Sequence, residues 1–232
     1  MKKPSVSEPV ADAGAAARAA ARASRRSIAW EYAEALIIAI VLAMVIRTFI
    51  VQAFKIPSGS MLQTLQVGDH ILVSKFLYRI TNPARGDIIV FKFPQDETRD
   101  FIKRVIGLPR DTIELRAKTL LINGRPLEEP YAIYESLNPF RETFGPVTVP
   151  PGHLFMMGDN RDSSQDSRAW GFLDVEKVRG KAFVIYWSWD AGWRVRWSRI
   201  GRLLRGCRWE PREAGWAAAP GKCDPRPVAA AR

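Results

Sequence analysis

Two serines, Ser58 and Ser60, flank Gly59 directly after Pro57 in the stretch 56–65. Proline fixes one backbone dihedral angle, and glycine permits conformations that other residues avoid. Such a turn can hold the Ser60 hydroxyl at the mouth of a strand, with Ser58 and local N–H groups aimed at the same point. The stretch therefore predicts a nucleophile beside hydrogen-bond donors. An ordinary Ser/Gly loop remains the alternative for this stretch taken alone.

A serine nucleophile needs a base, and histidine is the usual one when an aspartate orients it. The chain has two histidines, His70 and His153. Nothing adjoining either of them supplies a distinctive orienting acid. A Ser-His-Asp triad therefore rests only on the presence of the residues.

Lysine is the other candidate base, provided that burial keeps its amine neutral near pH 7. Lys103 fits this requirement because it lies within the apolar stretch 101–106, which reads as a strand. Lys75 and Lys92 also lie in apolar strands, so spacing alone does not choose between the three. Each could equally be a strand lysine whose ammonium group stays in water.

An apolar stretch, residues 35–54, precedes the serines. Crossing a bilayer takes about 20 apolar residues, so this stretch predicts a retained anchor, with bounds near 28–55. Arg47 lies well along it and could extend to the interface. A cleavable signal peptide is the alternative, but more than 30 residues would precede its apolar part and no small-x-small site follows. The arginines of 18–26 place the N-terminus in the cytoplasm and the rest of the chain outside.

From residue 69 onward, the sequence favours short β-strands over helices, because β-branched and aromatic runs alternate with turn signals. No helical periodicity of useful length follows residue 55, so we expect a mostly antiparallel β domain. The stretch 125–150 holds five prolines and reads as irregular, and 158–168 reads as a polar loop. The predicted strands are 70–76, 87–93, 100–106, 112–116, 119–122, 153–157 and 178–189.

Positive charge gathers at the C-terminal end. From residue 191 the chain has nine Arg and one Lys against two Glu and one Asp, within a net charge of +11. Such an end is typical of contact with nucleic acid or an anionic membrane. The Trp, Leu and Arg of 193–205 suit a membrane interface, whereas 1–27 and the basic tail 206–232 read as disordered. Cys207 and Cys223 could pair in an oxidising compartment, and two cysteines with two histidines give no zinc spacing.

Three motifs occur in order behind the apolar stretch: IPSGSM at 56–61, DFIKRVIGLP at 100–109 and GDNRDSSQDSR at 158–168. Together they resemble bacterial type I signal peptidase (leader peptidase), a family of Ser-Lys dyad serine proteases. The resemblance covers about residues 35–205. It implies a single transmembrane helix, then an antiparallel β-sheet catalytic domain over 56–205 with a small inserted β-subdomain at about 111–151. It implies no cofactor and no metal.

The resemblance also implies roles for individual residues. Ser60 resembles the nucleophile and Lys103 the general base. Ser58 resembles the oxyanion-hole side chain, and Ser164 resembles the serine that orients the lysine amine. Four charged residues resemble those that support the site, and six apolar ones fall where the family lines its shallow substrate pockets: Asp159, Arg161, Asp166 and Arg168, then Phe54, Ile56, Met61, Leu65, Phe101 and Ile102.

The activity that the resemblance implies is removal of N-terminal signal peptides of the Ala-X-Ala type from exported preproteins. The implied location is the bacterial inner membrane, single-pass, with a cytoplasmic N-terminus and a periplasmic catalytic domain. The partners would be preproteins and the lipid bilayer, with no nucleic acid. The sequence departs from the family at Gln63, where proline is usual, and in a short 110–150 segment that suggests a trimmed second β-subdomain.

Two other functions stay open at this point. A related Ser-Lys protease with another substrate, such as a self-cleaving repressor, would need a DNA-binding module, and residues 1–34 show no helix-turn-helix pattern. A membrane-anchored binding protein without enzymatic activity would leave Ser60 merely structural. Replacing Ser60 with alanine separates this last alternative from an enzyme.

Overall fold

A computed structural model describes residues 30–135, 143–207, 209–212 and 215–218. The predicted N-terminal tail, 1–27, lies outside these residues, as does most of the predicted C-terminal tail. The chain divides into two compact units, Met1–Thr48 and Phe49–Arg232.

Among the residues that the structure describes, one helix, Trp30–Ile50, is long and apolar enough to cross a membrane, judged by length and composition alone. Its last turn, η1 (Ile46–Ile50), is a π-helix. The prediction placed the apolar segment at 35–54, and its C-terminal end is wrong. Residues Val51–Lys55 form strand β1 and pair with β2 (Asp69–Ser74). An unbroken apolar run hides this change, because hydrophobicity alone does not separate a helix from a buried strand.

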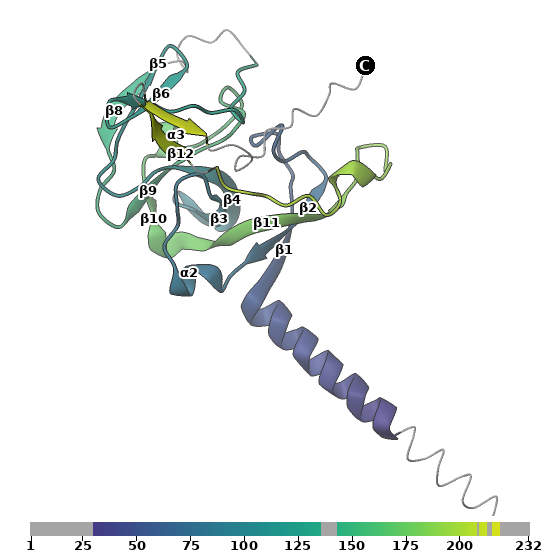
Figure 1. Cartoon of the computed structure of the whole chain (residues 1–232). Coiled ribbons are helices and arrows are strands. Elements are labelled where there is room, and N and C mark those ends of the chain that lie inside the picture. Colours follow the sequence, from purple (N-terminus) through teal and green to yellow (C-terminus); the bar gives the residue numbers. More distant parts are fainter. Residues whose placement is uncertain (1–29, 136–142, 208, 213–214, 219–232) are drawn as a thin grey trace, which may run out of the picture. The chain divides into compact units, whose positions relative to one another are not determined.

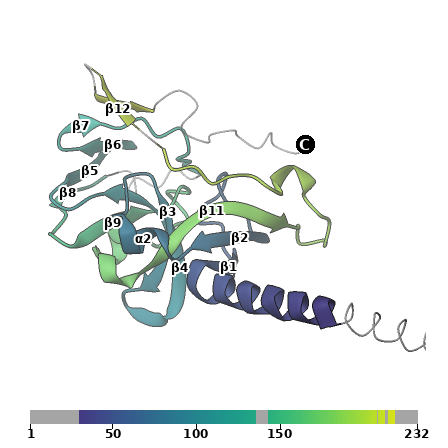
Figure 2. The same ribbon diagram turned by 60° about the horizontal axis from the view of Figure 1, so that its bottom comes forward.

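A seven-stranded sheet forms the centre of the second unit (Figure 1), in the order β1-β2-β11-β3-β4-β9-β10. All its pairings are antiparallel, which confirms the predicted mostly antiparallel β domain. β11 is the long green strand that crosses the unit in Figures 1 and 2. The remaining strands of this sheet are β3 (Ile88–Phe93), β4 (Asp96–Gly107), β9 (His153–Met157), β10 (Leu173–Asp174) and β11 (Val178–Ser188).

A second, four-stranded sheet has the order β7-β6-β5-β8, with bounds Arg125–Pro126, Thr119–Ile122, Thr112–Arg116 and Phe144–Thr148. β5, β6 and β8 lie together at one end of the unit (Figure 1). The expectation that 125–150 is irregular is wrong at β7 and β8. Prolines suggested the absence of strands, but β8 is an edge strand, and edge strands tolerate proline.

Short elements complete the described chain. They are α2 (Leu77–Ile80), α3 (Ser167–Trp170), η3 (Val175–Lys177) and η4 (Trp197–Arg199), followed by the hairpin β12 (Trp209–Arg212) and β13 (Gly215–Ala218). The expectation of an unstructured tail from residue 206 is wrong at this hairpin. The Trp209 indole Nε1 donates to the Glu128 carbonyl at 2.9 Å, and its ring packs edge-on against Tyr131. A single aromatic side chain thus anchors a segment whose composition suggested disorder.

The hydrophobic core that matters for the site lies beneath the serine turn. Ile56, Met61 and Leu65 are buried there against Ile71 of β2 and Ile185 of β11. Burying such side chains stabilises by about 1.5–3 kcal/mol each. Packing of these side chains into the core therefore fixes the position of the turn 56–61.

Candidate active site

Ser60 lies in the loop between β1 and β2. The loop closes at its base, where the Ile56 N–H donates to the Asp69 carbonyl at 2.9 Å and the Gly68 N–H donates to the Ile56 carbonyl at 3.0 Å. Met61, next to Ser60, is fully buried. These contacts fix the backbone on both sides of the hydroxyl group.

Gln63 has a backbone φ of +71°, in the left-handed region. Proline locks φ near −65°, so it does not fit this backbone conformation. The departure from the family pattern at Gln63 is therefore accompanied by a local turn geometry that excludes the usual proline.

The Lys103 amine lies against the Ser60 hydroxyl, with Nζ and Oγ 2.6 Å apart. Lys103 comes from β4, and its residue is 4% exposed, while Ser60 is 7% exposed. Burial lowers the pKa of Lys103 from 10.5 to about 8, against the opposing charges of Asp166 and Asp159. With a pKa of about 8, roughly one amine in ten is neutral at pH 7. The arrangement can therefore remove a proton from the serine hydroxyl.

Gly158 lets the polar loop 158–168 approach the serine turn. A Cβ at Gly158 would lie 2.3 Å from Ser164 Oγ and 2.5 Å from the Ser60 carbonyl oxygen. Separations this short are not tolerated, so a side chain here would push Ser164 and the turn apart. The Asn160 N–H also donates to the Ser60 carbonyl at 3.2 Å. Ser164 is thereby brought close to the Ser60 turn, and its role in orienting the lysine amine stays a prediction.

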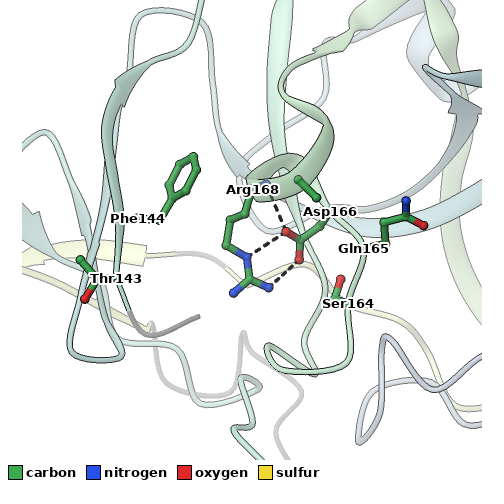
Figure 3. A pocket seen from close by; sticks show the side chains of 7 residues that line it. Thr143, Phe144, Ser164, Gln165, Asp166 and Arg168 are labelled. Atoms are coloured by element: carbon green, nitrogen blue, oxygen red, sulfur yellow. Dashed lines mark hydrogen bonds and ion pairs between the residues drawn. The ribbon is translucent and has the colours of Figure 1, made fainter. Parts of the chain in front are cut away.

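Asp166 and Arg168 form a buried ion pair within the same loop (Figure 3). Arg168 Nε and Nη2 each donate to the Asp166 carboxylate at 2.9 Å, and the Gly158 N–H donates at 3.1 Å. Burial alone would raise the pKa of Asp166, but these bonds, the Arg168 charge and the Ser164 hydroxyl outweigh it and lower the pKa. Asp166 therefore stays a carboxylate and keeps a negative charge near the Lys103 amine.

Asp159 is held by Arg104, a residue that the sequence did not single out. Arg104 Nε and Nη2 donate to the two Asp159 oxygens at 2.8 and 2.6 Å, and the Thr64 hydroxyl donates to the same carboxylate at 2.6 Å. Arg104 follows Lys103 directly on β4. The signal that could have found it is that a buried arginine needs a carboxylate partner.

Arg161 is braced by the segment 129–133, again a contact that the sequence did not predict. Its guanidinium forms a buried pair with Glu129, with Nη1 2.6 Å from Oε2. The Ile133 N–H donates to the Asp159 carbonyl at 2.8 Å, and the Arg161 N–H donates to the Ile133 carbonyl at 2.9 Å. Part of the stretch expected to be irregular thus holds the polar loop in place.

A cavity of about 510 Å³ opens in front of the Ser60–Lys103 pair. It contains the exposed Ser58, and two of the six apolar residues predicted for substrate pockets, Phe101 and Ile102. The structure does not place Ile56, Met61 and Leu65 in this wall; they lie in the core, and Phe54 packs against that core. The lining is Pro57, Ser58, Ser60, Arg99, Asp100, Phe101, Ile102, Lys103, Ser163 and Gln165.

The other candidate bases lie elsewhere. His70 packs edge-on against Trp189, and His153 Nδ1 lies 2.9 Å from the Pro151 carbonyl oxygen. Lys92, near the C-terminal end of β3, pairs with Glu97 at 3.2 Å. None of the three lines the cavity, and Lys75 does not line it either. Within the described residues, no group of three or more His, Cys, Asp or Glu side chains could hold a metal ion.

The second unit is an antiparallel β domain that sets a serine hydroxyl against a buried lysine amine, a pair that can act as nucleophile and base. The model of the family described as "Signal peptidase, peptidase S26" matches residues 29–187, more than half of the chain. The chain belongs to this family and is a peptidase, which confirms the resemblance drawn from the motifs.

Individual relatives agree with the family match. The chain is 39% identical to "Signal peptidase I" of Pseudomonas fluorescens, over 63% of this chain and 68% of that one. It is 37% identical to "Signal peptidase I" of Aquifex aeolicus (strain VF5), over 62% of this chain and 79% of that one. A crystal structure of a signal peptidase I from Enterococcus faecalis V583 is 37% identical, covering 44% of this chain and 97% of that one at a TM-score of 0.39.

Proposed function

We propose that this chain removes N-terminal signal peptides from exported preproteins by a Ser-Lys acyl-enzyme mechanism. The observation that carries the proposal is the 2.6 Å approach of the buried Lys103 amine to the Ser60 hydroxyl. Membership of the signal peptidase family and the names of the relatives support the choice of substrate.

In the proposed mechanism, neutral Lys103 takes the proton of Ser60 as Oγ attacks the scissile carbonyl. The negative charge that develops on the carbonyl oxygen is held by the exposed Ser58 hydroxyl and the Ser60 backbone N–H. Loss of one such donor typically costs about a hundredfold or more in rate. Lys103 then gives its proton to the leaving amine and takes another from the water that releases the acyl group.

The supporting residues act on the Lys103 amine and its surroundings. Ser164 lies against the Ser60 turn and orients the amine in the proposed mechanism. Asp166 with Arg168, and Asp159 with Arg104, keep two carboxylates near the amine, and their charges oppose the lowering of its pKa. The amine is thereby tuned to titrate near pH 8 rather than far below it. Arg161 braces the loop.

The substrate in this proposal carries small residues of the Ala-X-Ala type before the cut. The cavity wall supports this choice, because Phe101 and Ile102 present apolar side chains beside Ser60. Small apolar side chains such as alanine can pack against this part of the wall without losing hydrogen bonds to water.

The proposed location is the bacterial inner membrane, with helix Trp30–Ile50 as a single-pass anchor, a cytoplasmic N-terminus and a periplasmic peptidase domain. The second unit also carries a cluster of tryptophans suited to lipid headgroups. Trp193 and Trp197 are 75% and 72% exposed, and they contact the rings of Trp189 and Trp187. Replacing Trp193 and Trp197 with alanine should slow cleavage of a liposome-embedded preprotein but not of a short soluble peptide. If the double variant cleaved both the liposome-embedded preprotein and the soluble peptide at the wild-type rates, lipid contact by this cluster would be ruled out.

The experiment that tests the proposed function is cleavage of a preprotein by the purified chain, with Ser60→Ala and Lys103→Ala assayed beside it. The proposal predicts one cut, after an Ala-X-Ala sequence, that both substitutions abolish. Cleavage by Ser60→Ala at the wild-type rate would contradict it.

A further inference from the structure

A second cavity, of about 250 Å³, lies beside the polar loop 158–168 (Figure 3). It is bounded by the start of β8 and by the loop that leads into α3. Gln165 lines both cavities, so the two meet at this side chain. The lining of the second cavity is Thr143, Phe144, Ser164, Gln165, Asp166, Arg168 and Ala169.

The proposed reaction decides which part of the substrate lies near the second cavity. After Ser60 attacks, Lys103 Nζ gives a proton to the leaving nitrogen, which belongs to the first residue after the cut. That residue must therefore lie beside the Lys103 amine. Ser164, in the wall of the second cavity, lies close to the backbone of Ser60, because its Oγ and the Ser60 carbonyl oxygen are both within 2.5 Å of the same point, the position that a Cβ at Gly158 would take.

We propose that the second cavity binds the side chains of the first two residues after the scissile bond. This inference rests on the proposed function and extends it to the mature end of the preprotein. The residues before the cut occupy the cavity along Arg99–Lys103, and the chain then passes Gln165 into the second cavity. Ala169 and Phe144 set the size of side chain that it accepts.

The chemistry of the lining selects uncharged side chains of small to moderate size. Phe144 and Ala169 give an apolar surface, and the opposite charges of Asp166 and Arg168 cancel at 2.9 Å. Thr143 and Gln165 are exposed and can hydrogen-bond to the substrate backbone. A volume of 250 Å³ is below the roughly 300–1,000 Å³ of drug-sized ligand sites, which suits a short peptide segment.

The test uses the full chain in detergent and two peptides that are identical up to the cut. One peptide continues with Gly-Gly and the other with Leu-Leu. Ala169→Phe fills the cavity and should lower kcat/KM for the Leu-Leu peptide by about tenfold or more relative to the Gly-Gly peptide. The matched control is Ala191→Phe, at an exposed position outside both cavity walls, which should leave the ratio of the two values unchanged.

A second variant removes wall instead of adding it. Phe144→Ala enlarges the cavity. It should raise kcat/KM for a peptide that continues with Trp, relative to kcat/KM for the Gly-Gly peptide. If a variant lowered kcat/KM equally for the two peptides compared, the substituted residue would have only a structural role. That result would overturn the inference. Wild-type protein that cleaves neither peptide nor a preprotein would overturn the proposed function itself, and the subsite with it.

Discussion

Two buried polar clusters in the second unit differ in whether a carboxylate pairs directly with the basic side chain. Around Asp69, which is fully buried, Arg199 Nε donates to Oδ1 at 3.0 Å and the Ser188 hydroxyl donates to the same oxygen at 2.7 Å. In the site, the buried Lys103 amine lies against an alcohol instead, Ser60 Oγ at 2.6 Å. A buried cation that pairs directly with a carboxylate keeps its charge, whereas burial of an amine without such a pair lowers the pKa of the amine. The first cluster holds the fold, and the second is suited to chemistry.

The largest effect should follow from removing the amine. Lys103→Met keeps the length and apolar character of the side chain but cannot accept a proton, so kcat/KM should fall about a thousandfold or more. Lys92→Met, on the neighbouring strand β3, is the matched control and should keep its activity. A Lys103→Met protein with a tenth of wild-type activity would break the comparison.

Stability should respond to Lys103→Met in the opposite direction from activity. The pKa of Lys103 is about 8 in the folded chain against 10.5 for the unperturbed amine. Between these values the unfolded chain binds one more proton, so the free energy of unfolding of the wild type rises with pH in that window. Below pH 8 the buried charge costs on the order of 3 kcal/mol. The variant should be the more stable protein at pH 7, and urea unfolding at pH 7 and 10.5 should show the gap closing.

The Asp69 cluster should show the reverse pattern. Asp69→Asn leaves Arg199 and Arg196 without a full counter-charge, and breaking a buried pair typically costs about 3–5 kcal/mol. The free energy of unfolding should fall by this amount, while kcat/KM, measured well below the melting temperature, should change less than about threefold. Lost activity without lost stability would show that this cluster belongs to the chemistry after all.

A smaller effect should appear in the pH profile. The wild-type kcat/KM should rise with pH as the Lys103 amine loses its proton, with a midpoint near pH 8. Asp166→Asn removes a negative charge that raises the pKa of Lys103, so the midpoint should move to lower pH, by up to about one unit. Profiles of both proteins on one peptide measure the shift. A move to higher pH would contradict the electrostatic account.

The smallest effect should come from a neutral contact behind the site. Trp209→Phe keeps an aromatic ring against Tyr131 but loses the indole donor to the Glu128 carbonyl at 2.9 Å. A neutral hydrogen bond contributes about 0.5–1.5 kcal/mol, so thermal unfolding should begin a few degrees earlier. Because Glu128 adjoins Glu129, which holds Arg161, kcat should fall slightly with KM unchanged. An unaltered melting curve would remove Trp209 from the supports of the loop.

Local sequence predicted the parts of the fold that local forces decide. β3, β4, β9 and β11 follow β-branched and aromatic runs, and each lies close to its predicted range. β1 was missed because it continues an apolar run that begins in the helix. β8 was missed because Pro146 argued against a strand, and only its place at the sheet edge makes it possible.

Within the site, the sequence predicted the reacting residues better than the residues that hold them in place. A lysine in an apolar strand and a serine in a rigid turn could be paired through the family motifs, and the structure brings the two side chains together. Arg104 and Glu129 were not foreseen, because their partners lie 55 and 32 residues away along the chain. Burial of the apolar residues after Ser60 was also misjudged, since Met61 and Leu65 anchor the turn from the core.

The central claim is that burial holds the Lys103 amine at a pKa near 8, and NMR can measure this directly. Protein with 15N-labelled lysine side chains would be titrated from pH 6 to 11, with Lys103→Met used to assign the signal. The account predicts that the Lys103 amine titrates near pH 8. A Lys103 amine that titrates near 10.5, the value of the unperturbed amine, would contradict it.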